Sequence, residues 1–174
     1  MKQVLYGFGV AALLVLIGWQ WQKNSSTKVE NVTVTGPKPA EKVAYVTFDD
    51  GPSEITPGIL DTLKKYDAKA TFFLIGEEIT EEREEIVKRE IEEGHSVGVH
   101  TYCHKKEEMY CNKEYFWNDF EKCKTRIEEV IGKPVSLHRF PWGSNNGYVC
   151  PLVDDLMEEL QKKKITSFDW NVSG

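Results

Sequence analysis

The sequence predicts an α/β domain in which helices cover a parallel sheet, and three observations lead to this class. Short apolar runs recur along the chain from residue 43 onward. Between them lie longer segments whose apolar residues return every three or four positions, the period of a helix. Gly and Pro mark several of the junctions. Strands that alternate with helices in this way favour a parallel sheet with helical crossovers.

Five apolar runs are the expected strands. They are short, and polar residues follow most of them directly. They comprise residues 43–48, 70–75, 95–99, 135–138 and 165–168.

Helix starts and stops follow from capping chemistry. Thr56 is the expected N-cap of the first helix, with Pro57 in its first turn. Thr80 is the expected cap of the second, and Gly94 is its stop. The remaining two expected helices are residues 112–131 and a segment that opens at Pro151.

The N-terminal segment is predicted to lie in a membrane. Residues 4–21, VLYGFGVAALLVLIGWQW, are almost wholly apolar, which is short but sufficient for a span of about 17–25 residues. Trp19 and Trp21 stand where an interfacial aromatic belt would lie. No small-x-small site follows, so we expect an uncleaved signal anchor rather than a cleaved signal peptide. Lysines on both sides leave the orientation open.

These patterns predict three parts. Residues 1–21 form the anchor, residues 22–41 a polar linker broken by Gly and Pro, and residues 42–174 the folded domain. Composition adds two limits. The net charge of −6 argues against a nucleic-acid partner. The four cysteines permit two disulfides in three pairings or remain buried thiols, and without a C-x-x-C spacing they predict no cysteine zinc site.

Unusual polar and aromatic residues follow the expected strands at their carboxyl ends. This is the edge at which parallel α/β folds place active sites, so the pattern favours an enzyme. The residues are Asp49 and Asp50 after the first strand, His100 and His104 after the third, Arg139, Pro141 and Trp142 after the fourth, and Asp169 and Trp170 after the fifth.

Two imidazoles four residues apart, in HTYCH, can hold one cation when a carboxylate joins them. One aspartate of the DDG pair then binds the ion, and the other takes a proton from the attacking water. Arg139 is the expected cationic partner of a buried carboxylate. The alternatives are surface or core histidines and a solvated D-G turn. His138 and His95 are interpreted as structural, with His95 a lesser candidate for the site.

Four motifs then resemble the polysaccharide deacetylases of carbohydrate esterase family 4, the NodB homology domain. They are TFDDGP, HTYCH, RFPWGS and FDWNVSG, in family order across residues 43–174. The resemblance implies a distorted (β/α) barrel that hydrolyses N-acetyl groups of amino sugars. It also implies that Asp49 is the general base and that Asp50, His100 and His104 bind zinc or a similar divalent ion.

The resemblance assigns the other site residues by position. Arg139 would hold Asp49, and Asp169 would tune a catalytic histidine acid. Pro141 and Trp142 would lie on the substrate side, where the Trp142 backbone amide stabilises the oxyanion. Trp170 would line the acetyl pocket. Trp stands at position 142, where the family often has Tyr or Gly, and it still supplies the backbone N–H.

One departure concerns the family's fifth motif, a leucine and a histidine that protonates the leaving amine. The sequence ends directly after the fourth motif, so we expect a barrel incomplete at its C-terminus. The leading hypothesis is a single-pass membrane protein with an extracellular domain that deacetylates peptidoglycan or a chitin-like polymer of N-acetylglucosamine. The alternatives are an O-acetyl xylan esterase and an inactive metal- or sugar-binding remnant.

Overall fold

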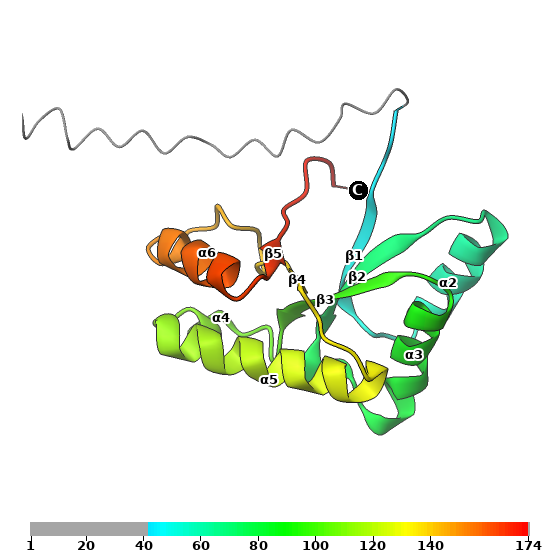
Figure 1. Cartoon of the computed structure of the whole chain (residues 1–174), viewed down its shortest axis with the longest axis horizontal. Coiled ribbons are helices and arrows are strands. Elements are labelled where there is room, and N and C mark those ends of the chain that lie inside the picture. Colours follow the sequence, from blue (N-terminus) through cyan, green and yellow to red (C-terminus); the bar gives the residue numbers. More distant parts are fainter. Residues whose placement is uncertain (1–41, 174) are drawn as a thin grey trace, which may run out of the picture. The chain divides into compact units, whose positions relative to one another are not determined.

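The computed structural model describes residues 42–173, and all its helices and strands fall in the compact unit that begins at Ala44. Its centre is one sheet of five parallel strands in the order β1-β2-β3-β4-β5 (Figure 1). The expected α/β class with a parallel sheet is confirmed. The strands are β1 Val46–Gly51, β2 Ala70–Ile75, β3 Ser96–Thr101, β4 Leu137–His138 and β5 Thr166–Ser167.

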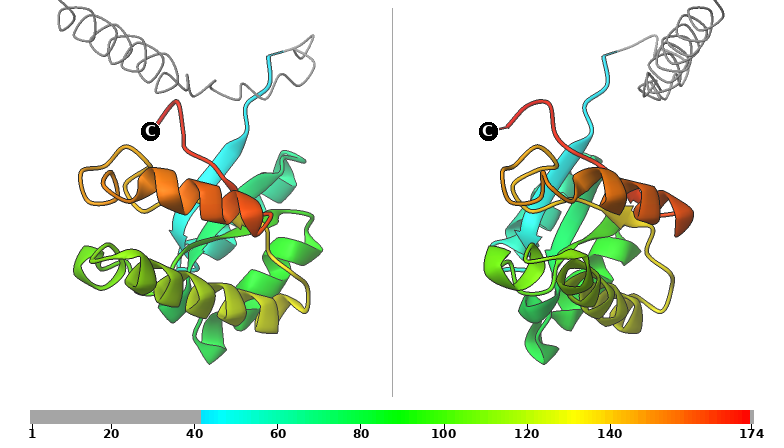
Figure 2. Two further views of the ribbon diagram at one scale, coloured as in Figure 1. Left: turned by 60° about the vertical axis from the view of Figure 1, so that its left-hand side comes forward. Right: turned by 90° about the vertical axis from the view of Figure 1, so that its left-hand side faces the viewer.

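Helices follow each of the first four strands. Figure 2 shows α5 and α6 side by side, and the Trp117 indole on α5 donates a hydrogen bond to Glu159 on α6 at 2.5 Å. The α-helices are α2 Thr56–Lys65, α3 Glu84–Glu92, α4 Lys106–Met109, α5 Lys113–Ile131 and α6 Val153–Lys162, and the 3-10 turns are η1 Gly76–Glu78 and η2 Glu81–Arg83.

The strand bounds differ from the sequence prediction mainly at β1. This strand begins three residues later than expected and runs on through Asp49 and Asp50 to Gly51. Asp49 pairs with Phe73 of β2, whereas Asp50 is left out of the ladder. The backbone of Asp50 is left-handed there, with φ of 66°. Both aspartates therefore belong to the last residues of the strand, where a bulge accommodates Asp50.

The N-caps predicted at Thr56 and Thr80 are wrong, whereas Gly94, the predicted stop of the second helix, directly follows the C-cap of α3 with a φ of 82°. Asn112 caps α5 by accepting a hydrogen bond from the Tyr115 backbone N–H at 3.1 Å. Thr56 lies inside α2, and its hydroxyl instead accepts from the Ser53 backbone N–H at 2.9 Å. Thr80 precedes the η2 turn and makes no side-chain cap. The short helix α4 was not predicted.

The core lies between the sheet and the helices. The apolar stripe of α5, predicted from its helical period, is buried against it: Phe116, Phe120, Cys123 and Ile127 are each at most 2% exposed. The four cysteines are free thiols, and the Cys123 thiol donates to the Leu74 carbonyl. The predicted anchor and linker, residues 1–41, lie outside the described residues. Between residues 42 and 173, no helix combines the length and the apolar character that crossing a bilayer requires.

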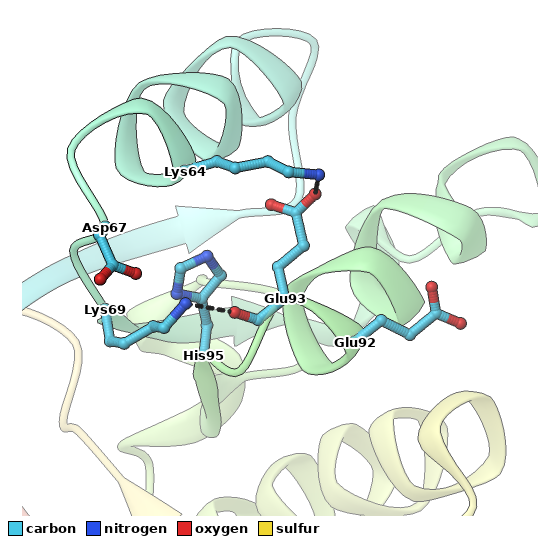
Figure 3. Close-up of a pocket in the computed structure, with 6 residues that line it drawn as sticks. All are labelled: Lys64, Asp67, Lys69, Glu92, Glu93 and His95. Atoms are coloured by element: carbon cyan, nitrogen blue, oxygen red, sulfur yellow. Dashed lines mark hydrogen bonds and ion pairs between the residues drawn. The ribbon is translucent and has the colours of Figure 1, made fainter.

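A polar cavity of about 250 Å³ lies where β2 and β3 begin, at the amino ends of the strands (Figure 3). His95 lines it and is almost completely buried, and its Nδ1 accepts from the Ala70 backbone N–H at 3.3 Å. Burial lowers the pKa of His95. Because His95 precedes β3 and His100 lies near its other end, the two histidines are separated by the length of the strand. The interpretation of His95 as structural agrees with this position.

Candidate active site

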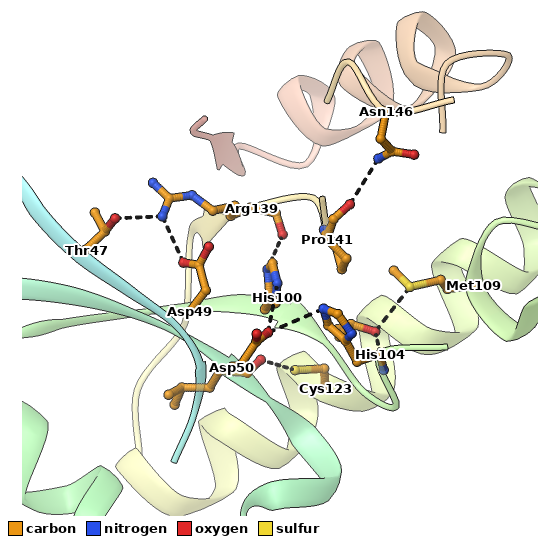
Figure 4. A network of polar contacts seen from close by, with 12 residues as sticks. Thr47, Asp49, Asp50, His100, His104, Met109, Cys123, Arg139, Pro141 and Asn146 are labelled. Atoms are coloured by element: carbon orange, nitrogen blue, oxygen red, sulfur yellow. Dashed lines mark hydrogen bonds and ion pairs between the residues drawn. The ribbon is translucent and has the colours of Figure 1, made fainter. Parts of the chain in front are cut away.

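The carboxyl edge of the sheet brings the predicted polar residues together. Asp49 and Asp50 lie near the end of β1, His100 lies near the end of β3, and Arg139 directly follows β4. Figure 4 shows these side chains converging from separate strands. This convergence follows from the parallel sheet, whose strands all end at one edge.

Asp50, His100 and His104 form a compact group of possible metal ligands. The Nε2 atoms of both imidazoles lie 3.3 Å from Oδ1 of Asp50. One ligand atom from each of the three residues lies within 4.8 Å of the others. The two rings are tilted against each other with centroids 5.4 Å apart. The three residues thus present two imidazole nitrogens and one carboxylate oxygen to a common point.

Hydrogen bonding orients the first of these imidazoles. The Arg139 backbone carbonyl lies 2.8 Å from Nδ1 of His100, which is 4% exposed. Because a carbonyl only accepts, Nδ1 carries the proton and Nε2 keeps a free lone pair toward Asp50. When Nε2 of His100 also carries a proton, its hydrogen bond to Asp50 is the main cause that lowers the pKa of that carboxyl, while burial acts in the opposite sense.

Asp49 faces the other way, toward Arg139. The Nη1 atom of Arg139 donates to Oδ1 of Asp49 at 2.8 Å and to the Thr47 hydroxyl at 2.7 Å. Its Nε donates to the Phe168 carbonyl at 3.1 Å. The guanidinium is 3% exposed and stacks on the Phe73 ring, 4.2 Å from its centroid. The two aspartates of one strand are therefore divided between a cationic side chain and the histidine pair.

The loop after β4 forms one wall of the site. Trp142 packs its ring against His104, with centroids 4.6 Å apart, and is 42% exposed. The Pro141 carbonyl accepts hydrogen bonds from Tyr110 at 3.2 Å and Asn146 at 3.0 Å. Within residues 42–173, the backbone N–H of Trp142 has no hydrogen-bond acceptor. That N–H is consequently free to bind a ligand.

The segment after β5 closes against this loop. The Asp169 carboxylate accepts from the Ser144 backbone N–H at 3.1 Å and from its hydroxyl at 2.5 Å. The Trp170 ring lies 5.6 Å from the Arg139 guanidinium and packs near Gly143. Asp169 thus holds the loop that follows Trp142, and its predicted role beside a histidine stays a prediction.

Left-handed backbone is concentrated at the site. Five non-glycine residues in the described part of the chain have φ near +60°, and three of them are Asp50, His104 and Trp142. Such conformations cost on the order of 1–3 kcal/mol and persist where the surroundings impose them. Their coincidence with the possible ligands is evidence for function that does not depend on any motif.

Some residues of the site could not be recognised from the sequence. Thr47 and Ser144 lie inside the motifs TFDDGP and RFPWGS, yet neither was assigned a role. Asp119 belongs to α5 and binds the HTYCH loop through hydrogen bonds to residues 16 to 18 positions earlier. Only its place on the helix relative to the buried stripe could have indicated this, because no local pattern marks it.

Comparison with known proteins assigns the family. Residues 36–159 match the polysaccharide deacetylases, which is well over half of the chain. The chain belongs to the polysaccharide deacetylase family. It is 43% identical over 131 residues to a peptidoglycan-N-acetylglucosamine deacetylase of Bacillus cereus, an alignment that covers 75% of this chain and 46% of that protein. The chain therefore spans about half the length of this relative.

Solved structures of polysaccharide deacetylases share the fold. The catalytic domain of a peptidoglycan N-acetylglucosamine deacetylase from Eubacterium rectale superposes with a TM-score of 0.72 at 34% identity, over 78% of this chain and 62% of that one. A family 4 acetyl xylan esterase from Clostridium thermocellum, in complex with a cobalt ion, superposes with a TM-score of 0.53 at 27% identity, over 57% of this chain and 49% of that one. The predicted resemblance is confirmed.

Proposed function

We propose that this protein is a metal-dependent deacetylase that hydrolyses N-acetyl groups of N-acetylglucosamine residues in peptidoglycan. The observation that carries the proposal is the division of the Asp49–Asp50 pair between Arg139 and the two histidines. Hydrolysis of an acetamide needs a base for water and an electrophilic centre for the carbonyl. The site offers candidates for both, side by side on one strand.

The ligand geometry fits a divalent cation, and zinc in particular. Neighbouring ligand atoms of a tetrahedral zinc site with bonds of about 2.0–2.1 Å lie about 3.4 Å apart. The Nε2 atoms of His100 and His104 each lie 3.3 Å from the Asp50 oxygen. Three protein ligands also leave the open position of a catalytic rather than a structural site. When bound, the ion lowers the pKa of water and polarises the acetamide carbonyl.

Asp49 is the proposed general base. Arg139 holds its Oδ1, which fixes the carboxylate and leaves Oδ2 to accept the proton from the attacking water. The Arg139 side chain is itself held by the Thr47 hydroxyl and the Phe168 carbonyl. The base therefore rests on a buried and fully engaged cation, which limits its movement during the reaction.

The substrate side of the site lies between Trp142 and Trp170. The free backbone N–H of Trp142 is the proposed donor to the oxygen that becomes negatively charged when water adds to the acetyl carbon. Trp170 is 44% exposed, and we propose that it lines the pocket for the acetyl methyl group. The carbon–nitrogen bond then breaks and the nitrogen takes up the proton that the water gave to Asp49, so that acetate and a free amine result.

The proposed substrate rests on the relatives, several of which are peptidoglycan deacetylases. We also propose that the apolar segment 4–21 anchors the chain in the cell membrane, with the domain outside facing the wall. The second candidate function is an O-acetyl xylan esterase, favoured by the likeness to the Clostridium thermocellum enzyme. Acetate release from peptidoglycan fragments and from acetylated xylan, measured side by side, separates the two.

The decisive experiment compares Asp49→Asn with the unchanged protein for zinc binding and acetate release. We expect the variant to bind zinc normally and to lose at least 100-fold in acetate release, since Asn cannot accept the proton. Asp67→Asn is the matched control, because Asp67 lines the cavity at the opposite end of the strands.

Equal release by Asp49→Asn and the unchanged protein overturns the role of Asp49. Tight zinc binding without release by either supports a metal-binding remnant instead.

A further inference from the structure

Asp119 binds every residue between the two histidines of the proposed metal site. Its Oδ2 accepts from the Thr101 hydroxyl at 2.7 Å and from the Tyr102 backbone N–H at 2.8 Å. Its Oδ1 accepts from the Cys103 backbone N–H at 3.2 Å and from the Cys103 thiol at 3.3 Å. One carboxylate of α5 thus accepts four hydrogen bonds from the loop that begins at His100 and ends at His104.

The hydrogen bonds continue from Asp119 to His104 itself. The Thr101 hydroxyl donates to Asp119 and accepts from the His104 backbone N–H at 3.3 Å. Thr101 is completely buried, so water does not compete for this hydroxyl. His104 has a φ of 53°, a backbone conformation that is uncommon outside glycine and that neighbouring contacts can stabilise. The chain from Asp119 through Thr101 provides that stabilisation.

The chemistry of a carboxylate suits this position. An ionised Asp is purely an acceptor, and all four partners are donors. Asn in its place would offer one oxygen and turn an NH₂ group toward two of these donors. The support is also rigid, since the neighbouring Phe116, Phe120 and Cys123 of α5 are buried in the core. The loop is consequently bonded to a helix that is packed into the core.

We infer that Asp119 is a positioning residue for the divalent cation, acting through Thr101 on the backbone of His104. This inference rests on the proposed metal site and assigns Asp119 no contact with the ion or the substrate. Residues that orient metal ligands typically change metal affinity about 10- to 100-fold when they are replaced. Loss of Asp119 should therefore weaken zinc binding by a factor in this range.

The experiment measures zinc affinity by competition with a chelator, and the absorption spectrum of the cobalt(II)-loaded protein, for a set of variants of the full chain. Asp119→Asn and Thr101→Val should each lower the affinity about 10- to 100-fold and shift the cobalt spectrum. Thr101→Ser keeps the hydroxyl and should restore both readings. The double variant Asp119→Asn/Thr101→Val should lose less zinc affinity than the product of the two single losses, because both substitutions break one chain of hydrogen bonds.

Glu121→Gln is the matched control, since Glu121 lies on the same helix and pairs with Lys163 at the surface. It should leave affinity and spectrum unchanged. An Asp119→Asn variant with unchanged affinity and spectrum overturns the inference and leaves the metal site standing. If that variant does not fold, the zinc affinity and cobalt spectrum of Thr101→Val are compared with those of Thr101→Ser, and equal values for the two overturn the inference. An unchanged protein that binds neither metal overturns the proposed metal site itself.

Discussion

At the scale of single residues, two carboxyl groups on helices differ in how their oxygens are paired. Asp119 accepts four hydrogen bonds from one loop. Glu90 on α3 is fully buried, and neither of its oxygens has a partner among the described residues. Burial without a partner raises the pKa of Glu90 to about 8. The carboxylate of Asp119 therefore stabilises the contact between α5 and its loop, whereas the unpaired carboxyl of Glu90 destabilises the fold when it is ionised.

Glu90→Gln should remove part of the pH dependence of stability. The pKa of Glu90 is raised in the folded protein, so its stabilising contribution is complete below about pH 4.5 and is lost as the pH rises toward 8. The unchanged protein should lose stability across this window, at up to about 1.4 kcal/mol per pH unit. Urea denaturation at pH 5 and pH 8 measures the difference between the protein and its variant.

The control for this prediction is Glu92→Gln, which changes an exposed carboxyl on the same helix. His95 titrates in the opposite sense, but it is present in both proteins and cancels in the comparison. A free energy of unfolding with the same pH dependence in the protein and in Glu90→Gln would contradict the prediction.

Most residues of the candidate site could be predicted from the sequence because they lie at strand ends. Asp49, Asp50 and His100 each end an apolar run, and a parallel sheet brings such ends together. Thr101 and Asp119 could not be predicted. Their meeting depends on how α5 packs against β3, which a local pattern does not record.

At the scale of elements, the β2–β3 pair determines where Arg139 lies. Gly98 of β3 stands opposite Phe73 of β2, and a Cβ at Gly98 would lie 2.8 Å from the Phe73 ring and 2.9 Å from Cβ of Leu137. Arg139 stacks on the same ring. The absence of one side chain thus makes room for the ring that supports the guanidinium.

Gly98→Ala should destabilise the fold and disturb the site together. The added methyl group forces Phe73 to move, at a cost of about 1–3 kcal/mol. Urea denaturation measures the stability, and acetate release measures the site. Gly58→Ala is the control of opposite sign, because Gly58 in α2 has no atom within 4 Å of a new Cβ. That variant should gain about 0.5–1 kcal/mol. Equal stability of Gly98→Ala and the unchanged protein would contradict the packing argument.

The elements themselves could be predicted to different degrees. The strand of residues 70–75 was predicted to the residue, because it is a buried apolar run with clear ends. The later strands β4 and β5 are only two residues long, shorter than their apolar runs. The length of each of these strands is set by how many of its residues pair with the neighbouring strand. The sequence of one strand does not contain that information.

At the scale of the whole molecule, a bound cation should stabilise the folded state. The proposed ligands come from β1, from β3 and from the loop after β3, so the ion binds the assembled sheet and not the unfolded chain. Zinc at about 100 times its dissociation constant should add about 2.7 kcal/mol. For a domain of this size, that raises the melting temperature by about 5–10 °C.

Thermal denaturation with zinc and with a chelator measures this effect. His104→Ala removes one ligand and should abolish the rise, whereas Asp155→Asn, on the surface of α6, should keep it. A melting temperature that does not respond to zinc in the unchanged protein would contradict the proposed metal site.

Arg139 has a further consequence, because its side chain forms hydrogen bonds with residues at both edges of the described sheet. It binds Thr47 and Asp49 on the edge strand β1, and the carbonyl of Phe168 directly after β5, the other edge of the described sheet. Fraying of β1 separates the proposed base Asp49 from Arg139, and fraying of β5 removes the Phe168 carbonyl that holds the guanidinium, while the helices remain packed. Catalytic turnover should therefore fail at lower denaturant concentrations than helical circular dichroism, so that inactivation precedes unfolding.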